Sequence, residues 1–377
     1  MASRLKIMIR ESLTGSSDSA FVPGSRIPIL RRKRRQAWSF PICCLCLAIL
    51  LGIAGCGGNG GGEGGVQYWH AEVVVPFGHQ PMPSPDGRWI AFGGMGDSTG
   101  IWVLDRDTNA ITRLTDSAHP HRWDYRWMPS SQALVFGGAG ESGTTTTGIW
   151  HVTCPAGVIT QLWQFGGDPD PAPNGQLVVL AGTSTQSDEA GIWAVGVSVP
   201  QIDRLTQVGT HPRYSPSGLL ISYTVPIGAG FPELRVMNQD GTNDRGVTND
   251  ILSQEWLDNA TLICSSAQGG VVSIIQVIIG LTPQILPVVQ GGSQYAASND
   301  LGLIVFQREE SGESLGLHLT TLAGGGSKPI RASGSYPQFL PSSATSGAID
   351  VVFEDSDGIL IASSTSGASP APIGLDP

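Results

Sequence analysis

"SPDGRWIAFGG", residues 84–94, is the stretch that decides the fold. It joins a tight turn, Pro-Asp-Gly, to the aliphatic strand that follows it. Degraded copies recur along the chain, and the second residues of the seven units are Pro85, Pro129, Pro173, Pro216, Asp258, Asn299 and Pro341. Successive intervals are 44, 44, 43, 42, 41 and 42 residues, which indicates one structural unit repeated seven times.

Two further markers keep pace with this turn. Gly-Ile-Trp follows the first three units from Gly100, Gly148 and Gly191, and related triplets hold the same place later. A Leu-Thr or similar pair closes the units, as at Leu114-Thr115. Turn residues separate these segments, so each unit predicts four short strands. Four strands in a repeat of about 40–45 residues are typical of a propeller blade.

The repeat resembles the WD40-like (PD40) repeat of TolB-like propellers and of prolyl-oligopeptidase-type propellers. The resemblance rests on Ser84-Pro85-Asp86-Gly87, the aliphatic strand after it and the Arg-Leu-Thr marker, and it covers residues 70–375. It implies an all-β chain that forms a seven-bladed β-propeller of four-stranded blades over 70–377. The small domain that TolB carries ahead of its propeller has no room here. A hydrolase domain is not expected, because the propeller repeats take up residues 70–375.

The spacing also predicts how the ring closes. Leu162, Leu205, Val247 and Ile330 each lie 11 residues before the next turn, and counting 11 back from Pro85 reaches Val74. Residues 71–76 are therefore expected to form the outermost strand of the seventh blade, paired with the strand near Ile359. The C-terminal alternative, "SPAPIG" at 369–374, is rich in proline, which cannot donate to a ladder.

The N-terminal region has the features of an export signal. A basic cluster at 31–35 precedes 17 uncharged residues from Trp38 to Ala54, which is short for a membrane span. Ile53-Ala54-Gly55-Cys56 resembles a bacterial lipobox, which implies cleavage before Cys56 and acylation of its thiol. We expect 1–55 to be a signal peptide with an extended or mis-started front, and 56–69 to be the lipidated cysteine and its linker. An uncleaved anchor helix is the alternative.

The linker and the charge constrain what the body can bind. Gly57–Gly65 holds seven glycines in nine residues, which is the composition of a flexible coil. Residues 1–55 hold nine basic and two acidic residues, so 12 basic and 29 acidic ones remain and the net charge there is −17. Such a chain repels nucleic acid, which is not expected as a partner. Cys154 and Cys264 fall on separate blades and are expected to be free, mostly buried thiols.

The innermost strand of each blade carries the candidate site. Side chains alternate along a strand, and one face of these strands is packing material while the other is polar. The polar face is expected to line the central channel, with the candidate ligand site formed by Asp124, Arg126, Asp168, Asp170, His211, Arg213 and Glu255. The alternative is that these groups only pair among themselves. No cofactor or metal is predicted, since His119 and His121 alone do not make a metal site.

Together these features predict a lipoprotein of the bacterial cell envelope, anchored through Cys56 on the periplasmic or cell-surface side. Its propeller is expected to be a non-catalytic scaffold that binds an envelope protein or a peptide, which is an inference from fold-level analogy. The alternative is a ligand sensor, or a carbohydrate-directed lyase or hydrolase, that uses the channel. An enzyme would need a deep pocket with perturbed carboxylates or a metal, which separates the two classes.

Overall fold

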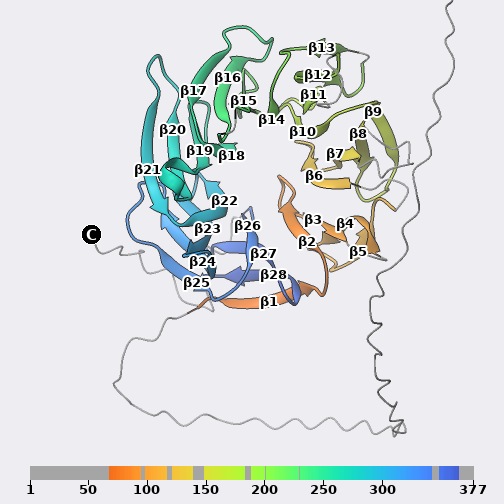
Figure 1. Cartoon of the computed structure of the whole chain (residues 1–377). Coiled ribbons are helices and arrows are strands. Elements are labelled where there is room, and N and C mark those ends of the chain that lie inside the picture. Colours follow the sequence, from red (N-terminus) through yellow and green to blue (C-terminus); the bar gives the residue numbers. More distant parts are fainter. Residues whose placement is uncertain are drawn as a thin grey trace, which may run out of the picture. The chain divides into compact units, whose positions relative to one another are not determined.

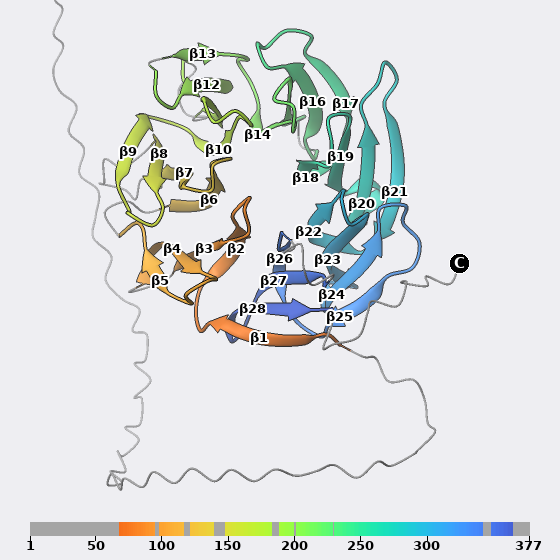
Figure 2. The same ribbon diagram turned by 180° about the vertical axis from the view of Figure 1, so that it is seen from behind.

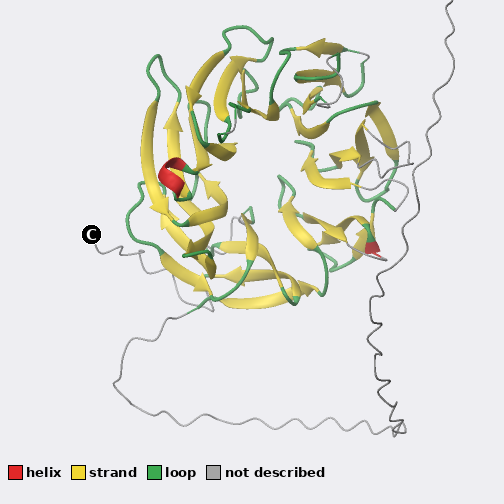
Figure 3. Cartoon of the chain, viewed as in Figure 1, coloured by secondary structure: helices red, strands yellow, loops and turns green. Residues whose placement is uncertain are grey.

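The computed structural model describes residues 68–364, apart from 95–97, 117–120, 139–147, 183–187, 200, 229 and 342–347. In this part the chain is all-β, with 28 strands in seven four-stranded antiparallel sheets arranged as the blades of a propeller (Figures 1 and 3). The predicted fold class is confirmed. The expected signal peptide, Cys56 and nearly all of the linker lie outside the described residues, and no helix of the described part is long and apolar enough to cross a bilayer.

The first four blades follow the chain from the centre outward. Blade 1 is β2 (His79–Pro83), β3 (Trp89–Gly94), β4 (Gly100–Asp105) and β5 (Ile111–Arg113). Blade 2 is β6 (His121–Trp127), β7 (Ala133–Gly138), β8 (Gly148–Thr153) and β9 (Ile159–Trp163). Blade 3 is β10 (Gly167–Pro171), β11 (Leu177–Ala181), β12 (Ile192–Gly196) and β13 (Ile202–Arg204). Blade 4 is β14 (Thr210–Tyr214), β15 (Leu220–Val225), β16 (Glu233–Asn238) and β17 (Arg245–Thr248).

The other three blades have the same order, except that the last borrows its outer strand. Blade 5 is β18 (Ile251–Trp256), β19 (Thr261–Ser266), β20 (Ser273–Ile278) and β21 (Gln284–Gln290), with the short 3-10 helix η2 (Gln268–Gly270) between β19 and β20. Blade 6 is β22 (Gly292–Ser298), β23 (Leu303–Glu310), β24 (Glu313–Thr321) and β25 (Lys328–Arg331). Blade 7 is β26 (Ser335–Phe339), β27 (Asp350–Asp355), β28 (Gly358–Ser363) and β1 (His70–Val75).

The ring closes as the spacing predicts. Strand β1 pairs antiparallel with β28, with His70 opposite Ser363 and Val75 opposite Ile359. Figures 1 and 2 both show β1, the first strand of the chain, lying beside β28, the last. Val75 is fully buried in this position. The outermost strand of the seventh blade therefore comes from the N-terminal end of the propeller sequence, whereas its other three strands come from the C-terminal end.

The hydrophobic core lies between the blades. Seven separate clusters of buried side chains occupy the seven seams between neighbouring blades. The cluster at the closing seam joins Val75, Val352 and Ile359 of blade 7 to Ile90 and Phe92 of blade 1. Each sheet is apolar on both faces and can bury them only against its two neighbours, so the ring is needed for the core to form.

The Gly-Ile-Trp and Leu-Thr markers recur together because they touch. Gly100 has a φ of +141°, and a methyl group there would overlap the carbonyl oxygen of Thr115. The Thr115 hydroxyl in turn accepts a hydrogen bond of 2.8 Å from the Ile101 N–H. The Arg113 guanidinium lies 5.5 Å from the centre of the Trp102 ring. Trp102, Trp150 and Trp193 pack at blade seams, as expected of structural rather than ligand-binding tryptophans.

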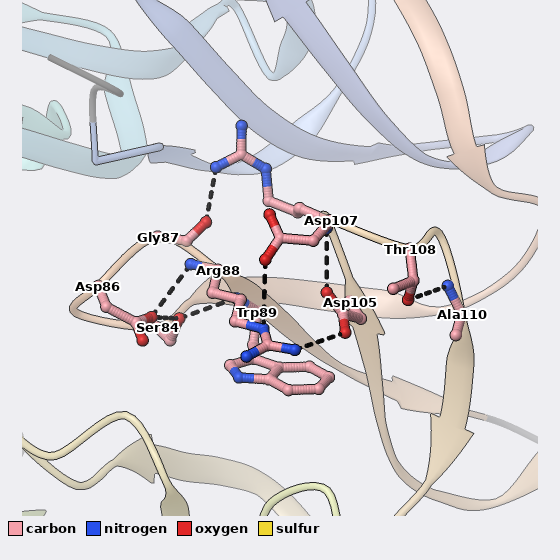
Figure 4. A network of polar contacts seen from close by, with 10 residues as sticks. Ser84, Asp86, Gly87, Arg88, Trp89, Asp105, Asp107, Thr108 and Ala110 are labelled. Carbon is pink, nitrogen blue, oxygen red and sulfur yellow. Dashed lines mark hydrogen bonds and ion pairs between the residues drawn. The ribbon is translucent and has the colours of Figure 1, made fainter.

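One face of the ring carries both the Pro-type turns and the outer hairpins, and we call it the turn face. In blade 1 the Arg88 side chain reaches Asp105 at 3.0 Å, and Arg106 donates to the Gly87 carbonyl at 2.6 Å (Figure 4). Equivalent backbone hydrogen bonds tie the hairpin between the third and fourth strands to the inner turn in six blades, for example Ile279 N–H to Ala260 in blade 5. The loops between the second and third strands lie on the opposite face.

The two cysteines of the described part are both free, as expected. Cys154 is half-buried in blade 2, and Cys264 is buried in blade 5. Burial raises the pKa of the Cys154 thiol to about 11 and the pKa of the Cys264 thiol still further above its ordinary value. Both thiols are therefore protonated and slow to react near neutral pH.

Candidate functional site

Each innermost strand contains a register irregularity that shapes the channel. In blade 1 the register jumps between His79 and Met82, so that two residues lie opposite one of β3. One extra residue is likewise inserted in the innermost strands of blades 3 to 7, and blade 2 has two extra residues, between His121 and Tyr125. Five residues at one equivalent position have positive φ values of 43–52°: Gln80, Asp168, His211, Gln294 and Tyr336. Since none of them is glycine, the sequence pattern gave no signal for this strained conformation.

The predicted alternation of faces agrees with the observed burial. The first packing-face residue of every innermost strand is buried, namely Pro81, Tyr125, Pro169, Pro212, Gln254, Tyr295 and Pro337. Their neighbours on the polar face are half-buried or exposed, except Ala296, which is buried. However, Pro81, Tyr125, Gln254 and Tyr295 also line an axial cavity. The bulge thus brings part of the packing face into contact with the channel, which simple alternation does not predict.

Two cavities lie along the axis, one toward each face. The cavity toward the face opposite the turn face, which we call the far-side cavity, has a volume of about 320 Å³. Residues from six blades line it, and they include Gln80, His211, Gln294 and Gln338. The turn-side cavity, about 600 Å³, is framed by Trp127, Tyr214 and Trp256 and by prolines at the turns of blades 1 to 4. Arg126, Arg213 and Glu255 line both cavities and therefore lie where the two meet.

These three residues and Asp170 form a charged belt across the channel. The Arg126 Nε lies 3.8 Å from the Asp170 carboxylate, whose other oxygen accepts a hydrogen bond of 2.8 Å from the Tyr214 N–H. Burial lowers the pKa of Arg213, and the nearby Arg126 lowers it further, while Asp170 and Glu255 act in the opposite sense. The belt holds two guanidinium and two carboxyl groups in one desolvated place, which a polar ligand could bridge.

Three buried polar atoms of the channel wall have no hydrogen-bond partner in the described part of the chain. They are the Arg213 Nε, the Tyr214 hydroxyl and the Gln254 Oε1. An unpaired buried polar atom costs about 1–3 kcal/mol, so native proteins rarely keep several at one place without use. All three belong to residues that line the axial cavities. An ordered water or a polar ligand in the adjoining cavities would give these atoms partners.

Of the seven predicted site residues, five line the axial cavities: Arg126, Asp170, His211, Arg213 and Glu255. Asp124 and Asp168 line neither, because Asp124 Oδ2 accepts a hydrogen bond of 2.8 Å from the Asp168 N–H. This bond joins blade 2 to blade 3 at the bulge. Asp168 also lies 3.6 Å from the His211 ring. The alternative role, pairing within the channel wall, thus describes Asp124 and Asp168, whereas the belt residues remain open to the cavities.

Residues outside the predicted set also build the site. The Trp127 and Trp256 indoles donate across their seams to the carbonyls of Met82 at 2.9 Å and Arg213 at 3.1 Å. The Gln254 side-chain amide donates to the His211 carbonyl at 2.8 Å. The two tryptophans, Trp127 and Trp256, occupy equivalent places in blades 2 and 5. Alignment on the turn shows the two tryptophans two residues ahead of the anchor, which was the available signal for a shared wall.

Wild type is expected to lose stability as pH rises because Asp170 ionises, and Asp170→Asn is expected to remove this loss. Burial raises the pKa of Asp170 above its ordinary 3.8, despite nearby Arg213 and Arg126. The folded state therefore binds this proton more tightly than the unfolded chain, so ionisation opposes folding from about pH 4 upward. The asparagine can still accept from Tyr214. The free energy of unfolding in urea, variant minus wild type, should rise with pH over that window and then level off.

Asp240→Asn is the matched control, with the opposite sign. Hydrogen bonds from the Thr242 hydroxyl and N–H lower the pKa of this exposed carboxyl. Its ionisation supports folding as pH rises, and the variant lacks that gain. The difference should therefore fall with pH for Asp240→Asn. A flat or falling difference for Asp170→Asn would contradict the description of Asp170 as a desolvated carboxyl.

The described residues contain no group of three or more His, Cys, Asp or Glu side chains placed to hold a metal ion. His119 lies outside the described residues, as do the atoms of the His121 side chain. The side chains that line the axial cavities supply guanidinium, carboxyl, imidazole, hydroxyl and amide groups.

Comparison with known proteins shows the fold and leaves the activity open. The chain matches no protein-family model and no curated protein. Among solved structures it resembles an oligogalacturonate lyase from Vibrio parahaemolyticus, with 13% identity and a TM-score of 0.61 over 81% of this chain and 99% of that one. It also resembles a puromycin-hydrolyzing peptidase from Mycobacterium tuberculosis, with 15% identity and a TM-score of 0.55 over 79% of this chain and 55% of that one. TolB from Acinetobacter baumannii is a third neighbour, at 12% identity and a TM-score of 0.44 over 75% of this chain and 62% of that one.

Proposed function

We propose that the protein is a lipoprotein of the bacterial cell envelope, anchored through Cys56, whose propeller is a non-catalytic scaffold for a protein or peptide partner. Residues 1–55 would serve as the signal peptide, 56–69 as the lipidated tether and 70–377 as the binding body. The lipobox-like Ile53-Ala54-Gly55-Cys56 and the glycine tract after it support the anchor. More than one acyl chain on the cysteine would be needed for stable attachment.

The turn-side cavity carries the binding proposal. Two tryptophans and a tyrosine frame it, turn prolines form its rim, and the charged belt forms its floor. Aromatic side chains and arginine are the groups that dominate binding energy in protein interfaces. A peptide end or a turn could place an apolar side chain between Trp127 and Trp256 and its polar groups on Arg126, Arg213 and Asp170. The unpaired Arg213 Nε and Tyr214 hydroxyl would then gain partners.

A channel-site enzyme or sensor is the second candidate, favoured by the likeness to oligogalacturonate lyase over almost the whole of that protein. At 13% identity this likeness extends to the fold alone. A lyase of this kind acts on acidic sugars, and two guanidinium groups are suitable for binding their carboxylates. Incubation with oligogalacturonate tests this candidate directly, because elimination releases an unsaturated, ultraviolet-absorbing sugar. Release of that product would reject the non-catalytic proposal.

The double variant Asp168→Asn with Arg213→Met is expected to lose at least tenfold in partner binding while it keeps the fold. Crosslinking pull-down from envelope membranes with the lipidated chain measures binding, and urea unfolding measures the fold. Arg88→Met is the matched control, since Arg88 is half-exposed and pairs with Asp105 on blade 1 outside the cavity. A partner captured equally by all three proteins would not be bound at the channel.

Tyr214→Phe separates binding from stability. Its hydroxyl is buried without a partner, so removing it should not destabilise the ring. If the cavity binds the partner, the variant should bind about three- to tenfold more weakly with an unchanged unfolding midpoint. Unchanged binding in both Tyr214→Phe and the double variant would place the partner elsewhere on the protein.

A further inference from the structure

We propose that the propeller sits with its turn face against the lipid surface and that the β20–β21 hairpin is the element that enters the headgroup region. This proposal rests on the proposed anchor at Cys56 and goes beyond it, because it fixes which face of the ring meets the bilayer. The partner is a lipid surface. Three observations support it.

The first observation is the place where the chain enters the ring. Strand β1 is the fourth strand of blade 7, and its first residue, His70, pairs with Ser363 at the end of β28. The third strand of each blade ends, and the fourth begins, on the turn face. His70 therefore lies on the turn face, and the chain that links it to Cys56 must leave the ring from that face.

The length of that link determines how far each face of the ring can lie from the membrane. Fourteen Cα–Cα steps separate Cys56 from His70. A glycine-rich coil of this length has an end-to-end distance of about 20 Å, similar to the length of a six-residue strand. To bring the opposite face to the bilayer, the link would have to use nearly all of its average end-to-end distance in running along the height of the ring. The turn face is therefore the one that a lipid on Cys56 holds closest to the membrane.

The second observation concerns exposed apolar side chains. The four most exposed large apolar residues of the described part are Leu281, which is fully exposed, and Leu219, Val158 and Val199, which are 57–61% exposed. All four lie on the turn face, in the inner turn of blade 4 and the outer hairpins of blades 2, 3 and 5. They stand singly around the ring instead of forming one contiguous patch. Separate apolar tips in one plane suit a flat lipid surface better than a protein partner, which buries a continuous core.

The third observation is a gap in the charge pattern. Residues 259–299, 41 in all, contain no Asp, Glu, Lys, Arg or His, although the chain as a whole is 14% charged. This segment includes β19, β20 and β21. The tip between β20 and β21 is Ile279-Gly280-Leu281-Thr282-Pro283. Charged groups at a bilayer must lose hydration or stay out, and the tip carries none. Blade 5 is thus the sector of the ring that can enter the headgroup region at the lowest cost.

The orientation has a consequence for the binding proposal. The turn-side cavity opens on the face that carries the turn prolines. A ring held in this way turns that cavity toward the membrane. Its partner would then be a segment close to the bilayer, such as the part of an envelope protein next to its own anchor, and not a free soluble protein.

Site-directed spin labelling of the lipidated full chain in phosphatidylcholine vesicles tests the orientation. A zwitterionic lipid is chosen because acidic residues such as Asp240 and Asp258 also lie on the turn face. The labelled variant is Leu281→Cys. The matched control is Val271→Cys, an exposed apolar position of the same blade at the other end of β20, on the opposite face. Wild type treated with the same spin label measures the background from Cys154 and Cys264, which burial makes slow to react.

We expect relaxation by lipid-soluble oxygen, relative to that by an aqueous nickel complex, to be at least threefold greater at position 281 than at 271. Equal ratios, or lipid contact at 271, would overturn the orientation. Protection of 281 from both reagents would also overturn it, because a second copy would then cover the hairpin.

A separate measurement isolates the anchor. Flotation of wild type with vesicles, compared with flotation of Cys56→Ala, reports lipid attachment without involving Leu281. If wild type floats and Cys56→Ala does not, while 281 stays aqueous, the anchor stands and the orientation fails. If wild type does not float, the anchor itself is wrong and the orientation falls with it.

Discussion

Deletion of residues 66–78 is expected to abolish the cooperative unfolding of the ring. The deletion removes β1, which supplies the outer strand of blade 7 and the fully buried Val75. It also removes Phe77, whose ring packs edge-on against Phe92 at 5.5 Å and Trp102 at 5.3 Å. Several buried apolar side chains and a whole strand ladder together contribute more than about 5 kcal/mol, which is comparable to the total stability of a domain.

Urea unfolding of the full chain, followed by tryptophan fluorescence, measures the effect. Wild type should give one sharp transition, and the deletion a broad, non-cooperative one. Glu72→Gln is the control, because Glu72 is exposed on the same strand and its replacement should leave the transition unchanged. Val75→Ala gives an intermediate case, with an expected loss of about 1–3 kcal/mol. An unchanged, single transition in the deletion would mean that another segment closes the ring.

Gly100→Val is expected to cost about 3–5 kcal/mol, the largest effect that we predict for a single substitution. Gly100 has a φ of +141°, where other residues are strained, and a side chain there would overlap the Thr115 carbonyl oxygen. The obstacle is the backbone of Thr115, which follows β5, so it cannot move without breaking the contact between the third and fourth strands. The shift of the urea midpoint measures the loss.

Gly302→Ala is the matched control for this substitution. Gly302 also has a positive φ, +67°, but nothing lies within 4 Å of the place where its Cβ would be. Only the conformational cost applies, which is about 1 kcal/mol. If the two variants lose the same amount, the close approach at Gly100 does not matter, and the Gly-Ile-Trp marker needs another explanation.

The sequence predicts the architecture well because repetition averages out local ambiguity. A single copy such as "SNDLGLIVFQR" from Ser298 is weak, yet its interval from its neighbours identifies β22 and β23. The closing strand follows from the same arithmetic, since Val74 holds the place that Leu162 and Leu205 hold in other blades. Blades 4 and 5 depart from the glycine marker, with Glu233 and Ser273 beginning their third strands, and spacing still places them.

The site is less predictable, for a physical reason. Whether an inner-strand carboxylate faces the cavity or bonds to the next blade depends on the bulge, and the bulge residues are not glycine. Asp124 and Asp170 are both aspartates on the polar face of an innermost strand, so the sequence pattern treats them alike. The structure gives Asp124 the Asp168 N–H and leaves Asp170 beside two guanidinium groups. Alternation with period two cannot separate these outcomes.

The pairing of β1 with β28 has a consequence for synthesis. The first strand to emerge waits for the last, so an unpaired edge with valines on it persists until nearly the whole polypeptide has been made. Contacts between residues this far apart in sequence form slowly. If translation stops after the sixth repeat, the seventh blade is incomplete and the ring stays open. The blades at its two ends then keep exposed apolar faces. We therefore expect β1 to stay unpaired longer during synthesis than it would if a C-terminal strand closed the seventh blade.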